Sequence, residues 1–253
     1  MTHSPAETTA SGAPERPISI GVCSWSLQPT SAEDLVSRMA EVGLDRVQLA
    51  LCPLLDDPQG FADVGRRLED AGVGILSGMF ESLDENYATL ESIRESGGVR
   101  PDRTWDANLA RATAAAPLAA AMGIDLVTMH VGFIPHRIED SGYAVLLERI
   151  RTIADRFGDH GIRLGLETGQ ETAATLIDTI RVLDHDGVGV NFDPANMLLY
   201  GMGDPIAAIE RLAPWVLQIH AKDARSCEVP GVWGAETRLG DRKSTRLNSS
   251  HAN

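Results

Sequence analysis

Short apolar runs alternate with longer amphipathic segments along most of this chain. The runs are short and rich in branched residues, as expected for buried parallel strands, whereas the longer segments repeat apolar residues at the helical period. Strict alternation of this kind predicts parallel strands joined by right-handed crossovers, an α/β architecture. The expected strands are 18–25, 46–51, 73–80, 125–131, 162–167, 188–193 and 216–220. The expected helices are 32–42, 61–71, 103–122, 143–160, 172–184 and 205–212.

Glycines mark four of the boundaries in this pattern. Gly43, Gly72, Gly123 and Gly161 each follow an expected helix and come just before an expected strand. Glycine is favoured there because the residue after a helix often adopts a left-handed conformation. The repetition of this signal supports the alternation more strongly than residue propensities alone.

A doubly wound sheet and a closed barrel both satisfy this order of elements. The first strand is not followed by GxGxxG or GxxxxGK[ST], so nothing supports a nucleotide-binding sheet. Polar residues instead collect at the carboxyl ends of several strands, where barrels build their active sites. We therefore expect an α/β (β/α)₈ TIM barrel as one domain over residues 18–241, with only about seven βα units and strand eight missing.

The two ends of the chain differ from this pattern. Residues 1–17 are rich in Ser, Thr, Pro and Ala and lack the features of a secretory signal, so we expect a disordered leader. Residues 242–253, RKSTRLNSSHAN, have no apolar periodicity and resemble translated adaptor or vector sequence. We expect them to be an unstructured, artefactual tail on a truncated barrel. An open edge on the first and seventh strands then predicts aggregation.

Charge and cysteine content restrict the partners and the compartment. The formal net charge of −14 disfavours nucleic acid as a partner, because the protein would repel a phosphate backbone. No stretch approaches the roughly 20 apolar residues of a membrane span, so a membrane partner is not expected either. Cys23, Cys52 and Cys227 have no close pairing, which favours a reducing cytoplasm.

Two carboxylates and an imidazole fall at the ends of three successive strands. Glu167, Asp193 and His220 end the fifth, sixth and seventh expected strands, whose tips converge in a barrel. Singly, such an acid is commonly a helix cap and such a histidine a packed core residue. Together they form a mixed nitrogen and oxygen set that suits one Mn²⁺, Mg²⁺, Co²⁺ or Zn²⁺ ion. Glu171 opens the next helix, where the dipole explains a carboxylate without a further role.

Other side chains near strand ends are candidates for binding a substrate. His130 closes the fourth strand and contacts either the substrate or a ligating carboxylate, with a packed core histidine as the alternative. Lys222 follows His220 and pairs with a phosphate or hydroxyl, unless it is a solvated loop charge. Trp25 and Phe80 end the first and third strands and either wall the pocket or pack in the core. Trp233 lies on the loop after strand seven and is a candidate lid element.

Three phrases in a fixed order carry a family resemblance. GLETGQET, VNFDPANM and QIHAKD resemble the xylose isomerase-like barrel superfamily of sugar phosphate isomerases and epimerases, over residues 18–240. In its ketose 3-epimerase branch, Glu, Asp, His and a final Glu on strand eight hold one divalent ion. The resemblance implies that Glu167, Asp193 and His220 are the first three ligands, and the fourth has no counterpart here. Asn196 stands where related epimerases often have a substrate-binding His.

The reaction implied by this resemblance is proton abstraction next to a carbonyl, through an enediolate. The ion polarises the carbonyl and an adjacent hydroxyl, and Glu167 is the candidate catalytic acid or base as well as a ligand. The missing strand-eight Glu is the expected second proton-transfer group, so two-sided transfer should fail in this chain. Small sugars, sugar phosphates and cyclitols are all possible substrates, and a homo-oligomer is compatible with the sequence.

Other activities share this scaffold. Inosose dehydratases begin with the same proton abstraction and then eliminate water, and a non-catalytic sugar-binding barrel would keep only the fold. An apurinic endonuclease branch holds three zinc ions and needs more histidines, including one three residues after the strand-six Asp. This chain has Asn196 at that position, which disfavours a role in DNA repair.

Overall fold

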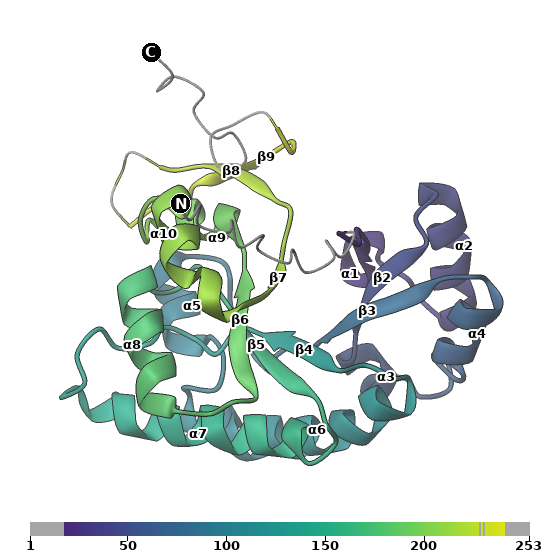
Figure 1. The fold of residues 1–253 in the computed structure, drawn as a ribbon, viewed down its shortest axis with the longest axis horizontal. Coiled ribbons are helices and arrows are strands. Elements are labelled where there is room, and N and C mark those ends of the chain that lie inside the picture. The colour runs from purple at the N-terminus through teal and green to yellow at the C-terminus, as the bar shows by residue number, and fades with distance from the viewer. Residues whose placement is uncertain (1–17, 228, 230, 241–253) are drawn as a thin grey trace, which may run out of the picture.

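The computed structural model describes residues 18–227, 229 and 231–240 of the chain. Its centre is a parallel seven-stranded sheet in which the strands are neighbours in chain order (Figure 1). Successive right-handed βα units produce this order. The strands are β1 (Val22–Cys23), β2 (Arg46–Ala50), β3 (Gly74–Met79), β4 (Leu126–Met129), β5 (Arg163–Glu167), β6 (Val188–Phe192) and β7 (Val216–Ile219).

Helices cover the outer, convex side of this sheet, as the ribbon in Figure 1 shows for α6 and α7. Their inner faces bury apolar clusters, and in the largest of these Phe80, directly after β3, meets Phe157 of α7 edge to face. The helices are α1 (Ser24–Leu27), α2 (Ala32–Val42), α3 (Cys52–Asp56), α4 (Val64–Asp70), α5 (Leu90–Ser96), α6 (Asp102–Ala121), α7 (Ser141–Gly158), α8 (Ala173–Leu183), α9 (Pro194–Leu199) and α10 (Pro205–Leu212), and a 3₁₀ turn spans Ala213–Trp215. None of the described helices is long and apolar enough to cross a membrane.

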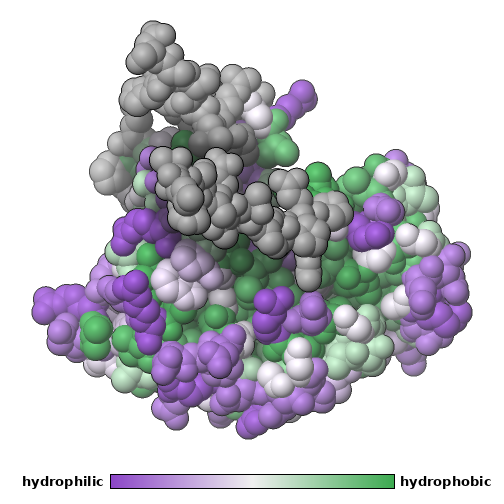
Figure 2. Space-filling model, viewed as in Figure 1, coloured by the Kyte–Doolittle hydropathy of each residue, from purple (hydrophilic) through white to green (hydrophobic). Residues whose placement is uncertain are grey.

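The sheet curls into most of a barrel. Across its interior, the hydroxyl of Ser77 on β3 donates to Oε1 of Gln218 on β7 at 2.6 Å. Within the described residues, β1 pairs with β2 and β7 pairs with β6, but β1 and β7 do not pair with each other. The part of the chain that the structure describes is therefore the expected α/β TIM barrel, less one βα unit. Figure 2 shows hydrophilic side chains along the lower edge, over the outer helices, and hydrophobic side chains across the middle of this face.

A small antiparallel hairpin lies beyond β7. Its strands, β8 (Asp223–Arg225) and β9 (Ala235–Thr237), pack beside α9 near the carboxyl ends of the barrel strands (Figure 1). The amide of Gly234 donates to the carbonyl of Leu199 at 3.3 Å, which ties the hairpin to α9. The sequence pattern assigned no element to this segment.

Most of the expected elements are confirmed, and the first strand is the main correction. The four glycines at helix ends have φ between 69° and 74°, the left-handed conformation that was predicted. β1 covers only Val22–Cys23, because the side chain of Ser24 accepts the amide of Ala50 at 2.9 Å and the chain then turns into α1. Trp25 therefore lies in a short helix and not at a strand end. The expected leader, 1–17, and the expected tail, 242–253, lie outside the described residues.

Candidate metal centre

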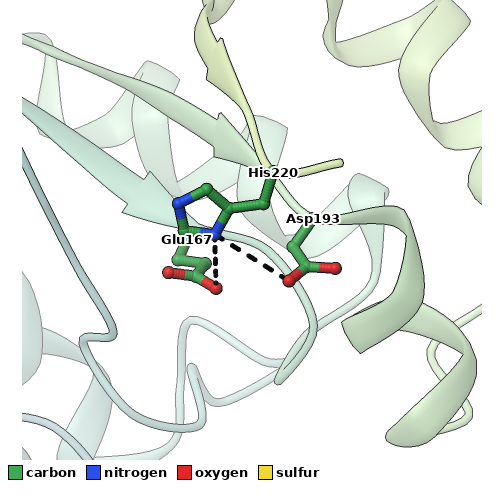
Figure 3. Close-up of side chains that lie close together, drawn as sticks. All are labelled: Glu167, Asp193 and His220. Atoms are coloured by element: carbon green, nitrogen blue, oxygen red, sulfur yellow. Dashed lines mark hydrogen bonds and ion pairs between the residues drawn. The ribbon is translucent and has the colours of Figure 1, made fainter. Parts of the chain in front are cut away.

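Three side chains meet at the carboxyl ends of three neighbouring strands. Glu167 is the last residue of β5, Asp193 follows β6 directly, and His220 follows β7. Since the strands are parallel, these positions lie at the same end of the barrel, and Figure 3 shows the three side chains facing one another. One ligand atom from each lies within 4.8 Å of the others. We call these three residues the triad.

The triad combines short contacts with burial. Nδ1 of His220 lies 3.2 Å from Oε1 of Glu167 and 3.9 Å from Oδ2 of Asp193. The Asp193 residue is only 1% exposed, and Glu167 is 7% exposed. Burial, and then the nearby Glu167 carboxylate, raise the pKa of Asp193. Two buried carboxylates that repel each other are a site that a cation would stabilise.

Asp193 is held in place by backbone contacts. Its Oδ1 accepts the amide of Asn196 at 2.9 Å and so caps the first turn of α9. Its own amide donates to the hydroxyl of Thr168 at 2.8 Å. These bonds occupy one carboxylate oxygen and leave Oδ2 directed toward His220.

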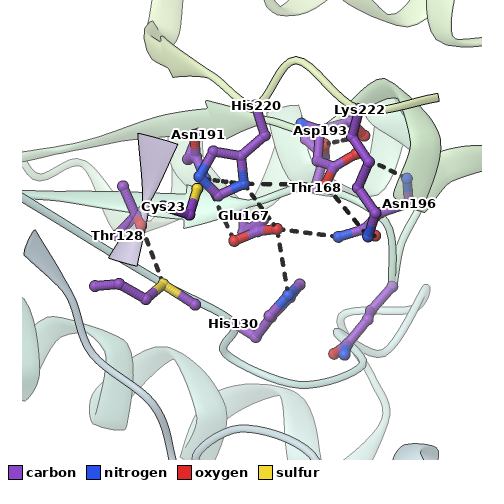
Figure 4. A network of polar contacts seen from close by, with 12 residues as sticks. Cys23, Thr128, His130, Glu167, Thr168, Asn191, Asp193, Asn196, His220 and Lys222 are labelled. Atoms are coloured by element: carbon purple, nitrogen blue, oxygen red, sulfur yellow. Dashed lines mark hydrogen bonds and ion pairs between the residues drawn. The ribbon is translucent and has the colours of Figure 1, made fainter. Parts of the chain in front are cut away.

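Glu167 lies at the centre of a wider polar network (Figure 4). Oε1 accepts the side-chain amide of Asn196 at 3.0 Å and lies 3.4 Å from Nε2 of His130. Burial opposes ionisation of Glu167, but His130 and His220 outweigh it and hold the pKa of Glu167 well below its usual range. Burial lowers the pKa of His130, and the Glu167 carboxylate more than reverses this, raising it to about 9. His130 thus contacts the Glu167 carboxylate, one of the two in the triad.

The remaining predicted site residues line one cavity of about 1560 Å³ that includes the triad. Nζ of Lys222 lies 2.7 Å from Oε1 of Glu236 and 3.2 Å from Oδ1 of Asn196, so this lysine faces the site. The ring of Trp25 lies 6.1 Å from that of His220. Phe80 borders the cavity but is fully buried in the core, which was its alternative assignment.

Trp233 and Glu171 have surroundings that the sequence did not indicate. Trp233 borders the cavity and packs edge to face on Tyr200 at 4.9 Å. Glu171 was expected to open a helix with no role beyond the helix dipole, but it precedes the cap residue Thr172 and is 3% exposed. Among the described residues its Oε1 has no hydrogen-bond partner. Burial, opposed by His130, raises the pKa of Glu171 to about 8.

Sequence reasoning missed several groups that line the cavity. Oε1 of Gln48, on β2, lies 2.7 Å from Nε2 of His220 across the barrel. Its one available signal was a polar residue inside an apolar strand. Glu85 and Tyr87 lie between β3 and α5, where the sequence gives no periodic signal, and the Tyr87 hydroxyl donates to Oε2 of Glu85 at 2.8 Å.

Comparison with known proteins shows which family this chain belongs to. The family model described as xylose isomerase-like TIM barrel matches residues 32–243. The chain belongs to this family. A xylose isomerase domain protein from Planctomyces limnophilus is 29% identical, with a TM-score of 0.74, over 79% of this chain and 72% of that one. A 3-dehydroshikimate dehydratase of Bacillus anthracis is 31% identical over 86 residues, 32% of this chain and 30% of that protein's length.

Solved structures of lower identity resemble this chain in fold. A xylose isomerase-like TIM barrel protein from Mycobacterium smegmatis, solved in complex with magnesium, has a TM-score of 0.61 at 18% identity and covers 87% of this chain and 80% of that one. An L-ribulose 3-epimerase has a TM-score of 0.61 at 18% identity and covers 79% of this chain and 68% of that one. The neighbours thus include epimerases as well as a dehydratase.

Proposed function

We propose that this family member is a divalent-metal-dependent isomerase or epimerase that acts on a small sugar or cyclitol. The observation that carries the proposal is the convergence of three ligand atoms, two of them carboxylate oxygens, within 4.8 Å of one another at the carboxyl ends of β5 to β7. Epimerases among the solved neighbours support the same reaction class. The three described cysteines are all free, which supports a cytoplasmic location.

The triad fits one divalent ion on two physical grounds. Ligands about 2.0–2.4 Å from a common ion lie at most about 4.8 Å apart, as the triad atoms do. Two carboxylates with one imidazole suit Mn²⁺, Mg²⁺, Co²⁺ or Zn²⁺, and the neighbour solved with magnesium is consistent with this set. The ion would supply polarisation of a substrate carbonyl and an adjacent hydroxyl.

The protein's own groups then define the proton transfer. Glu167 is the proposed base, since His130 and His220 keep its carboxylate ionised. Its removal of a C–H proton next to the carbonyl leads to an enediolate. Asn196 and Lys222 are placed to bind substrate oxygens, and Trp25 forms part of the wall. Exchange on one face of the substrate requires Glu167 alone, whereas inversion at carbon requires a second group on the other face.

Hydrogen exchange tests this proposal whatever product is eventually formed. The metal-stripped protein, reloaded separately with each of the four ions, is incubated in D₂O with a panel of ketoses, aldoses and inososes. Nuclear magnetic resonance then follows deuterium entering the carbon beside the carbonyl. We expect exchange that requires the ion and disappears in Glu167→Gln. Glu210→Gln, an exposed change on α10, is the matched control that keeps exchange. Exchange that persists in Glu167→Gln would contradict the role of this carboxylate.

Dehydration is the second candidate, favoured by the match to the Bacillus anthracis 3-dehydroshikimate dehydratase. Both reactions begin with the same proton abstraction and differ in whether a hydroxyl then leaves. Mass spectrometry separates them, because dehydration gives a product lighter by one water. Incubation of the metal-loaded protein with 3-dehydroshikimate and with inososes is the direct comparison, and a product of unchanged mass favours the isomerase.

A further inference from the structure

Negative side chains dominate the carboxyl-end rim of the cavity. We call this rim the mouth; it comprises the cavity-lining residues at the carboxyl ends of β3 to β7 and directly after them, together with those of β9. Among the described residues, the cationic side chains of the mouth are Lys222 and His130, whose raised pKa of about 9 favours the protonated imidazole, whereas Arg163 lines the opposite end at the start of β5. The carboxylates of the mouth are Glu81, Glu85, Glu167, Asp193 and Glu236.

The ammonium group of Lys222 is already surrounded by oxygen atoms. Nζ lies 2.7 Å from Oε1 of Glu236, 3.2 Å from Oδ1 of Asn196 and 4.0 Å from Oδ2 of Asp193. Glu236 and Asn196 lie within hydrogen-bond distance of this ammonium group, and Asp193 attracts it at ion-pair distance. An anionic substrate would compete with these partners for Lys222, and Glu236 is the partner that the hairpin strand β9 supplies.

The wall beyond β3 adds acceptors and further negative charge. The Glu85 carboxylate accepts the Gly98 amide at 2.7 Å and the Tyr87 hydroxyl at 2.8 Å, so it is fixed in place. Burial and the neighbouring Glu85 raise the pKa of Glu81, a sign that negative charge is already unfavourable here. Oxygen acceptors of this kind suit substrate hydroxyl groups, which can donate to them.

We propose that the mouth selects an uncharged polyhydroxyl substrate and rejects phosphate- or carboxylate-bearing ones, with Glu236 enforcing this choice by occupying Lys222. The inference rests on the proposed function for its metal-loaded state. With a divalent ion at the triad, the five carboxylates still exceed by one the combined positive charge of that ion, Lys222 and protonated His130. A phosphate dianion would enter against this field, whereas a neutral sugar would not.

Binding of inorganic phosphate to the magnesium-loaded protein tests the role of Glu236. Trp25 and Trp233 line the cavity, so their fluorescence is a suitable reporter. We expect Glu236→Gln to bind phosphate at least about fivefold more tightly than wild type, since one competing charge is gone. Addition of Lys222→Met should abolish this gain, and Glu210→Gln should match wild type. Unchanged phosphate affinity in Glu236→Gln, or a gain that survives Lys222→Met, would overturn the inference.

Turnover of matched sugar pairs keeps this inference separate from the proposed function. D-fructose and D-fructose 6-phosphate are compared by deuterium exchange in wild type and Glu236→Gln. Faster exchange of the phosphate ester in wild type overturns the charge selection while leaving the isomerase proposal intact. Absence of exchange with any sugar, combined with the expected phosphate titration, contradicts the isomerase proposal alone.

Discussion

Nδ1 of His220 lies 3.2 Å from Oε1 of Glu167, although 53 positions separate the two residues in the chain. The contact exists because β5, β6 and β7 are consecutive parallel strands, so residues at their carboxyl ends share one side of the barrel. Asp193, at the end of the strand between them, completes the triad. The most informative experiments therefore change these side chains one at a time.

Glu167→Gln should abolish stabilisation by metal. A ligand at one hundred times its dissociation constant stabilises a folded protein by about 2.7 kcal/mol, which is a rise of about 5–10 °C in melting temperature for a domain of this size. Differential scanning calorimetry with Mn²⁺ should show this rise in wild type and in Glu210→Gln, but not in Glu167→Gln. An undiminished rise in Glu167→Gln would exclude this carboxylate as a ligand.

Two substitutions at Asp193 should separate its two roles. Asp193→Asn keeps a side chain that can cap α9, whereas Asp193→Ala removes the cap, so the alanine variant should lose about 1 kcal/mol more of metal-free stability. Both variants lose the ligand charge and should bind metal at least about 100-fold more weakly. Urea unfolding and equilibrium dialysis measure the two effects. If the metal-free forms of Asp193→Asn and Asp193→Ala are equally stable, the side-chain cap of α9 makes no measurable contribution to stability.

Glu171→Gln should stabilise the protein increasingly as pH rises. The folded pKa of about 8 lies above the usual value of about 4.3, so the folded state favours the protonated acid. Its contribution to stability is complete below the unfolded pKa and is lost as pH rises through the folded one. We expect the stability of the variant relative to wild type to be greater at pH 9 than at pH 5 by about 4 kcal/mol. Guanidinium unfolding at pH 5 and pH 9 measures the free energy of unfolding of both proteins. An equal difference between wild type and Glu171→Gln at the two pH values would contradict the prediction.

Lysines beside the edges of β1 and β7 that no described strand pairs with should reduce self-association. Ile20, just before β1, is 69% exposed and Ile219 of β7 is 57% exposed. Apolar residues beside unpaired strand edges promote pairing between chains, and lysine opposes it. The double variant Ile20→Lys and Ile219→Lys should sediment with a smaller average mass than wild type. Ile138→Lys, at a 59% exposed loop position away from the edges, is the control. If Ile138→Lys lowers the average sedimenting mass equally, the reduced self-association is due to the change in overall charge and not to the strand edges.

Much of the fold followed from local patterns. Apolar runs, helical periods and terminal glycines are local signals, and together they predicted the order of strands that the structure confirms. The grouping of Glu167, Asp193 and His220 was also accessible, because parallel strands bring successive strand ends together by topology alone. Their role as metal ligands stays a prediction.

Contacts made across the barrel were not accessible in this way. Gln48 and His220 are 172 positions apart, and their pairing depends on how far the sheet curls. Glu236 contacts Lys222 because both lie beside or within the β8–β9 hairpin, and no periodic pattern in the sequence predicted this hairpin. The burial of Glu171 likewise depends on the path of the loop after β5, because an acid before a helix is equally compatible with solvent.

The two walls of the cavity are encoded in separate parts of the chain. A single stretch from Glu167 to His220 contains the whole triad, and an earlier stretch contains Gln48, Glu81 and Tyr87 on the opposing side. Recombination within the family could therefore replace one stretch and retain the other. Such exchange would give an unchanged triad a new set of substrate contacts, a modular route by which one barrel scaffold diversifies.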